Sequence, residues 1–251
     1  MIRKTVLALM LAAAGVNAHA ALSAGDIAFT SFNADEDGLS FVTFKNIDAN
    51  TTIFFSDNEW GGSAFNTGES YNQWNSGSSQ IDAGSVIRFS AYDKTTLSAS
   101  TGTLSRVTVA SNTNWGISTT ADTIYAYLGS SATAPTTFLS AISNATDGSL
   151  VGTGLTEGTN AIRLNSIATG ATPDYAEYNG ARSGAASFDA YKAQVNNVAN
   201  WTIDTTNGSY ASTLPNTTAF SVTAVPEPKI YAMFLAGLGL MGLIARRKGK
   251  N

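Results

Sequence analysis

Short apolar stretches alternate with polar, turn-forming sequence along residues 21–224. The apolar stretches are rich in aromatic and β-branched residues, which favour β-strands. Asp35-Glu36-Asp37-Gly38 fits a turn between the first two stretches, and Asp48-Ala49-Asn50 fits a turn between the next two. The pattern predicts strands at residues 26–32, 39–45, 51–56, 85–91, 104–110, 123–128, 137–142, 161–165, 201–203 and 219–222.

One segment, residues 188–199, follows a helical period instead, and Ser187 before it fits a helix N-cap. Its apolar side chains share one stripe: Phe188, Tyr191, Val195 and Val198. Many strands without alternating helices favour an all-β fold, and we expect an immunoglobulin-like β-sandwich with one short helix near its C-terminal end. The sequence contains neither an internal repeat nor an interdomain linker, so residues 21–224 are expected to form one domain.

Residues 1–20 have the three parts of a secretory signal peptide. A basic start is followed by the apolar residues 6–16 and by the small-x-small site Ala18-His19-Ala20. A transmembrane helix is the alternative, but 11 apolar residues are too few, since a bilayer takes about 20. We therefore expect a signal peptidase to cut between Ala20 and Ala21 and the mature chain to be exported.

A second apolar segment lies within residues 225–251. Residues 230–245 carry no charge, and these 16 residues would reach about 24 Å as a single helix, slightly short of a hydrocarbon core of about 30 Å. Pro226 and Pro228 mark the end of the soluble chain, because proline cannot continue a helix. Arg246-Arg247-Lys248 should stay in the cytoplasm. The segment is therefore suited to a weak or temporary membrane anchor.

Pro226-Glu227-Pro228, the Gly- and Leu-rich apolar run and the terminal Arg246 and Arg247 resemble the PEP-CTERM sorting signal of Gram-negative bacteria in order, spacing and position. The resemblance implies that an exosortase recognises and cleaves this tail, in organisms that build exopolysaccharide. The chain would then be exported through the inner membrane and held transiently by its C-terminal helix. Its final place would be the cell surface or the extracellular matrix.

The composition limits the chemistry of residues 21–224, which we call the body. The chain has no cysteine, and its single histidine, His19, lies in the predicted signal peptide. Ser-His-Asp and Cys-His nucleophiles and His- or Cys-based zinc sites are therefore excluded from the mature chain. Residues 21–224 hold 7 Lys or Arg against 17 Asp or Glu, a net charge of −10. Such an acidic surface argues against nucleic acid or anionic lipid as a direct partner.

Several short segments of the body carry a second resemblance: Gly25-Asp26-Ile27-Ala28-Phe29, Asn33-Ala34-Asp35, Phe41-Val42-Thr43-Phe44, residues 51–60, residues 65–69 and Asn200-Trp201-Thr202. Together they resemble exported bacterial β-domains that are mostly uncharacterised, some of them similar to lamin-tail immunoglobulin sandwiches. This resemblance implies a fold for residues 25–203. It does not assign a catalytic role to any residue of this chain.

Asn33, Asp35 and Asp37 alternate before Gly38, as oxygen ligands do in the first half of a calcium loop. The twelfth position of an EF-hand count is Phe44, however, where a bidentate Glu is needed. A hairpin turn that uses the Asp-Gly backbone preference is the favoured interpretation. Ca²⁺ binding is kept as a hypothesis, and no other cofactor is expected.

Residues 57–75 are expected to form a long loop that holds acidic and aromatic side chains. Aromatic faces stack on sugar rings and carboxylates bond sugar hydroxyls, so the loop could bind a polysaccharide. The favoured alternative is that Trp60 and Trp74 pin the loop onto the sandwich. A carboxylate pair could also serve a glycosidase. The candidate glycan ligands are Asp57, Glu59, Trp60, Tyr71 and Trp74.

These observations predict an exported, exosortase-processed surface or matrix protein that is associated with exopolysaccharide in a biofilm. We expect a structural or adhesive role and no enzyme activity. Two alternatives are a carbohydrate-binding module that uses the aromatic loop and a secreted carboxylate-dependent hydrolase.

Overall fold

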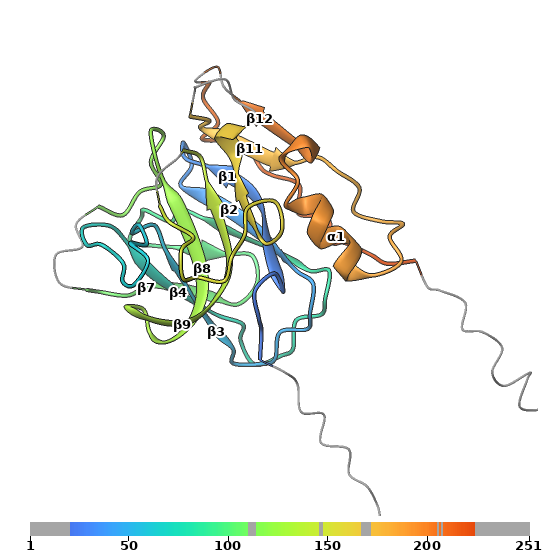
Figure 1. Ribbon diagram of the computed structural model, residues 1–251, viewed down its shortest axis with the longest axis horizontal. Helices are drawn as coiled ribbons and strands as arrows, with labels where there is room; N and C mark the ends of the chain where they lie inside the picture. The colour runs from blue at the N-terminus through green and yellow to red at the C-terminus, as the bar shows by residue number, and fades with distance from the viewer. Residues whose placement is uncertain are drawn as a thin grey trace, which may run out of the picture.

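Two six-stranded sheets face each other across a common core in the computed structural model, which describes residues 21–109, 114–145, 148–166, 172–204, 206 and 208–223 (Figure 1). The strand order is β12-β11-β1-β2-β5-β6 in the first sheet and β10-β9-β8-β3-β4-β7 in the second. Neighbouring strands are antiparallel throughout these sheets, except that β10 runs parallel to β9. The all-β sandwich predicted from the sequence is confirmed.

The first sheet combines the start and the end of the described chain. It contains β1 (Ile27–Asn33), β2 (Gly38–Thr43), β5 (Val86–Ser90), β6 (Ser98–Ala99), β11 (Tyr175–Tyr178) and β12 (Trp201–Asp204). The second sheet contains β3 (Thr52–Ser56), β4 (Tyr71–Asn75), β7 (Thr103–Arg106), β8 (Thr123–Ser131), β9 (Ala134–Ser143) and β10 (Ala161–Arg163). The helical elements are α1 (Phe188–Val195) and the 3₁₀ turns η1 (Leu164–Ser166) and η2 (Val198–Asn200).

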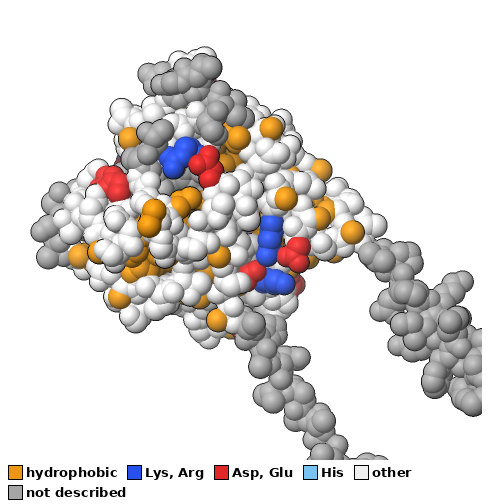
Figure 2. All heavy atoms as spheres, viewed as in Figure 1, with side chains coloured by type: hydrophobic (Ala, Val, Ile, Leu, Met, Phe, Trp, Pro, Cys, Tyr) orange, Lys and Arg blue, Asp and Glu red, His pale blue; other side chains and the backbone are white. Residues whose placement is uncertain are grey.

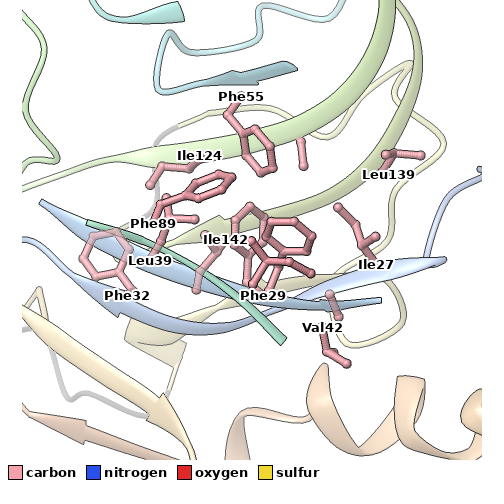
Figure 3. Packing of buried hydrophobic residues seen from close by; sticks show 14 of the residues in the cluster. Ile27, Phe29, Phe32, Leu39, Val42, Phe55, Phe89, Ile124, Leu139 and Ile142 are labelled. Carbon is pink, nitrogen blue, oxygen red and sulfur yellow. The ribbon is translucent and has the colours of Figure 1, made fainter. Parts of the chain in front are cut away.

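An aromatic cluster fills the space between the sheets. Phe55 from β3 contacts Phe41 and Phe89 of the first sheet, with ring centroids 5.6 and 5.0 Å apart. Trp74 from β4 stands edge-on to Phe41 at 5.5 Å, and all of these rings are fully buried. Figure 3 shows how Phe29, Phe55 and Phe89 converge from the two sheets. Alternate strand positions point inward, so the alternating apolar pattern of the sequence builds this core.

A second apolar cluster covers the outer face of the second sheet. Tyr71, Tyr125 and Tyr127 project from the sheet on this side, and the loop that follows β3 folds back over them. Phe65 from that loop lies between Trp60 and the tyrosine rings at 5.1 to 5.9 Å. The strands at the centre of this sheet are therefore buried on both faces, which explains their nearly continuous apolar sequence.

The helix α1 packs on the outer face of the first sheet, beside β1 (Figure 1). Ser187 is the N-cap, as predicted, and its hydroxyl accepts a hydrogen bond from Ala190 N at 3.3 Å. Tyr191 and Val195 are buried beneath the helix. The helix ends at Val195, four residues earlier than predicted, because Asn196 caps it and a 3₁₀ turn follows.

Nine predicted strands coincide with observed ones. Three strands were missed: β4, which was expected to lie in a loop, the two-residue β6, and β11. Residues 219–222 make only a single bridge, between Val222 and Ala185, and no strand. The predicted signal peptide, the end of the predicted strand at Ala110 and the predicted C-terminal apolar helix lie outside the described residues. Among the described residues, no helix is long and apolar enough to cross a membrane.

Replacement of Trp74 by Ala should lower the free energy of unfolding by about 3–5 kcal/mol, because it leaves a large cavity between the sheets. It also removes the indole N–H that donates to Thr101 O at 2.7 Å. Urea unfolding followed by tryptophan fluorescence and circular dichroism measures the change. Leu214→Ala is the control: Leu214 is 73% exposed, so its effect should stay within about 0.5 kcal/mol. Equal stability of the two variants would contradict this account of the core.

Candidate functional site

The turn between β1 and β2 carries the three predicted calcium ligands, and together they hold two other parts of the chain. The Asn33 amide donates to Tyr210 O at 3.0 Å, and Asp35 Oδ2 accepts from Tyr210 N at 2.6 Å. Asp37 Oδ1 accepts from Ile117 N at 2.6 Å. In the part of the chain that the structure describes, no group of three or more His, Cys, Asp or Glu is placed to hold a metal ion. Calcium binding stays a prediction, and the turn acts structurally as a fastening point for two loops.

Asp37 is also perturbed electrostatically. The pKa of Asp37 is raised to about 7, chiefly by burial and also by the nearby Asp93, while the hydrogen bond from Ile117 N–H opposes these effects. Lys94, which is paired with Asp93, lowers it in part. The backbone of Asp37 has φ of 54°, a left-handed conformation that Asp tolerates better than most residues.

The predicted aromatic binding loop is not a loop throughout, and its side chains are not on one surface. Trp74 lies on the inner face of β4 in the main core, whereas Trp60 and Tyr71 lie in the outer cluster. Each of the three is buried, and the Trp60 indole N–H donates to Val151 O at 2.9 Å. These rings therefore do not form the exposed stacking surface that the polysaccharide hypothesis requires. The favoured alternative, in which Trp60 and Trp74 fasten this segment to the sandwich, agrees with their positions.

The two carboxylates of this segment differ sharply in environment. Glu59 is half-exposed and accepts a hydrogen bond from the Asn66 amide. Asp57 is fully buried, and its Oδ1 accepts from Ser70 N at 2.7 Å and from Ser70 Oγ at 2.8 Å. Burial raises the pKa of Asp57 to about 7, against the effect of the Ser70 hydrogen bonds and the Arg106 guanidinium. The Asp57 side chain therefore changes its protonation state around neutral pH.

Asp57 belongs to a buried polar cluster at one end of the inter-sheet space. The Tyr92 hydroxyl lies beside Asn72 and Ser70 and is influenced by the Asp57 charge, and burial raises the pKa of Tyr92. Arg106 stands opposite Asn72 in the β4–β7 register and donates to Tyr92 O at 2.7 Å. Some polar atoms of this cluster lack a partner of normal geometry among the described residues. They are Asp57 Oδ2, Asn72 Oδ1 and Nδ2, Tyr92 Oη and Arg106 Nη1.

A small pocket of about 30 Å³ opens to the surface next to this cluster. Trp115 is 39% exposed at its rim, and the Arg106 guanidinium lies 4.4 Å from the centroid of the Trp115 ring, a cation–π geometry. The pocket has room for about one water molecule or one small polar group. Its lining residues are Ser70, Tyr71, Arg106, Val107, Thr108, Val109 and Trp115. No sequence pattern points to Arg106, Tyr92 or Trp115, because only the folding of the chain brings these residues together with the Asp57 cluster.

The last described residues are bonded to the rest of the fold. Phe220 is 3% exposed and packs against Phe44, Tyr178 and Tyr191, with ring centroids 6.2, 5.7 and 5.1 Å away. The backbone N–H groups around it are bonded to the body: Phe220 N to Gly84 O, Ser221 N to Arg182 O and Thr223 N to Ala185 O, each at 2.8 Å. Thr223 is the last described residue.

The predicted processing residues fall mainly beyond Thr223 in the sequence. Pro226, Glu227, Pro228, Arg246 and Arg247 lie outside the described residues, as does Ala20. Ala21 is exposed at the start of the described chain.

Comparison with known proteins identifies the tail. Residues 224–248 match the PEP-CTERM protein-sorting motif. No curated protein and no solved structure matches the chain. The motif indicates an exported protein that is targeted to an exosortase and anchored in the membrane through its C-terminal tail. The identification of the tail from its sequence is confirmed.

The raised pKa of Asp57 predicts a pH-dependent stability. In the folded state the Asp57 carboxyl group keeps its proton up to about pH 7, whereas in the unfolded chain it loses the proton near its ordinary pKa of 3.8. The folded state therefore binds more protons between these values, so stability falls as the pH rises through this window. Asp57→Asn keeps an acceptor for Ser70 but does not titrate, so its melting temperature should fall less over the same range.

Thermal unfolding between about pH 4 and pH 8 measures this difference. The pKa of Asp37 is also raised, and Asp37 is still present in the Asp57→Asn variant. The fall in melting temperature should therefore become smaller in the variant and not vanish. Glu59→Gln removes a half-exposed carboxylate and controls for net charge. Identical pH profiles for Asp57→Asn and the unmodified protein would contradict the assignment.

Proposed function

We propose that the chain is a non-enzymatic surface or extracellular-matrix protein, released from its membrane anchor by an exosortase and associated with exopolysaccharide. Its role in this proposal is structural or adhesive. The observation that carries the proposal is the sorting motif at residues 224–248, which begins directly after the last described residue of the folded body. The motif supplies the route to the surface, and the body is the part that remains there.

The surface of the body is suited to contact with a hydrated polymer. Figure 2 shows one face on which uncharged side chains and backbone predominate and charged side chains gather in a few small groups. Residues 21–224 are rich in Ser, Thr, Asn and Gly and carry a net charge of −10. Hydroxyl and amide groups exchange hydrogen bonds with sugar hydroxyls, and the net negative charge limits association between copies of the body.

The absence of enzyme activity is also part of the proposal. Asp57 is fully buried, while Glu59 is half-exposed and bonded to Asn66, so the two carboxylates do not share an open cleft. A glycosidase needs two carboxyl groups that flank its substrate. The burial of Asp57 therefore favours a non-catalytic role over the carboxylate-dependent hydrolase.

A carbohydrate-binding module is the second candidate, and Trp115 is the observation that favours it. Its ring is the one large aromatic side chain among the exposed hydrophobic residues of the described chain. The ring lies next to Arg106 and to the pocket that Ser70 lines, so an aromatic face and hydrogen-bonding groups are close together. Sugar recognition commonly combines such groups.

Processing should depend on the motif. In the native host, Glu227→Ala should leave the tail uncleaved, so that the protein stays in the membrane fraction with its C-terminus at Asn251. Mass spectrometry of fractionated cells measures the mass and place of each form, and a strain without the exosortase should give the same result. Leu214→Ala, a change of an exposed body residue, should be processed normally. A surface-located form of the unmodified protein that still ends at Asn251 would contradict the proposal.

Trp115→Ala should weaken binding to the host exopolysaccharide by about two- to tenfold if sugar rings stack on this side chain. Retention of the purified body on immobilised polysaccharide measures the affinity. Leu214→Ala is the matched control, because it also shortens an exposed apolar side chain. Equal retention of the two variants would contradict the proposal of a carbohydrate-binding module and would favour the structural role.

A further inference from the structure

The last four described residues, 220–223, form what we call the C-terminal latch. Besides the bonds of Phe220, Ser221 and Thr223 to the body, the Tyr191 hydroxyl donates to Ser221 O at 2.7 Å. The backbone N–H of Thr223 is thus bonded, as are both backbone polar groups of Ser221. The latch holds the chain to the body up to the residue that precedes the sorting motif.

The ring of Phe220 gives the latch a buried anchor. Besides its aromatic neighbours, the Arg182 guanidinium lies 4.9 Å from the ring centroid. Gly84, which has φ of 91°, lies against the backbone of Phe220, so close that a Cβ at this position would collide with Phe220 O. A buried aromatic residue in such a fitted site keeps the opened state sparsely populated.

The latch leaves little chain between the body and the motif. From Thr223 to Pro226 there are three residues, which extend over about 10 Å at most. Extended peptides are commonly recognised through their main-chain N–H and C=O groups as well as their side chains. The groups that lie immediately before the motif are already bonded to Arg182, Ala185 and Tyr191. A membrane peptidase must therefore either bind the motif close to the folded body or bind it only after the latch has opened.

We propose that opening of the C-terminal latch controls access of the exosortase to the sorting motif. The proposal rests on the proposed function, because it concerns how the same tail is processed. In the closed state the body restricts the approach to the motif, and release of residues 220–223 supplies free extended chain. The state of the folded body therefore sets the rate of its own release from the membrane.

A linker insertion tests access without touching the latch. About ten Gly and Ser residues placed between Thr223 and Ala224 add a flexible span of roughly 17 Å. The inserted form should be processed faster than the natural chain, on the order of tenfold if the latch is open in about a tenth of molecules. Pulse-chase labelling in the native host, with separation of the precursor and the processed form, measures the rates. The same insertion in the exposed segment after Leu214 is the control, because it lies before the latch.

Two further variants change the latch itself. Phe220→Ala should open it and also speed processing, with circular dichroism to verify that the body still folds. Ala185→Cys with Val222→Cys should lock it, because these residues are bridge partners and the chain has no other cysteine. The locked form should be processed more slowly than either single-cysteine variant, and a membrane-permeant reductant should restore its rate.

The outcomes separate the two proposals. If the linker form, the locked form and the natural chain are all processed at one rate, the latch proposal is overturned and exosortase processing stands. If no form is processed, or if processing persists in a strain without the exosortase, the proposed function itself fails. Slower processing of the linker form would also overturn the latch proposal, because the exosortase would then depend on the nearby body.

Discussion

The fold depends on covering the second sheet on both faces. Its central strands, β3 and β8, carry large apolar side chains on each side, so one sheet packed against them is not enough. The first sheet covers the inner face, and the loop that follows β3 must return over the outer face with Trp60 and Phe65. That return places Asp57 at the bend, where it has no access to water. The unusual electrostatics of Asp57 is thus a consequence of how the sheet is covered.

The sequence predicts the parts of this arrangement that depend on local pattern. Short apolar stretches rich in aromatic and β-branched residues identify the central strands, and the cap at Ser187 identifies the start of α1. The strand β4 escapes the prediction because its sequence, Tyr-Asn-Gln-Trp-Asn, has the composition of a loop. Its polar side chains are tolerated because pairing with β3 and β7 satisfies the backbone, and because Asn72 lies within a buried polar cluster.

The candidate site is harder to predict, because its residues meet only through the topology. Tyr92 follows a strand of the first sheet, whereas Arg106 belongs to the second, and no spacing in the sequence links either of them to Asp57. The aromatic residues that looked like ligand contacts, Trp60, Tyr71 and Trp74, are instead buried in the two apolar clusters. The sorting motif is the reverse case: it is a linear signal, read from contiguous residues, so the sequence alone identifies it.

The pairing of β1 with β11 has a consequence for the order of events during export. The first strand of the described chain lies at the centre of its sheet, and one of its two neighbours is β11, in which Tyr175 pairs with Asn33. A chain that crosses a membrane from its N-terminus would present β1 long before that neighbour arrives. Non-local pairing of this kind slows folding and leaves a strand edge open in the meantime. A partly translocated chain therefore offers an aggregation-prone edge, which makes its emergence a natural point for a chaperone to act.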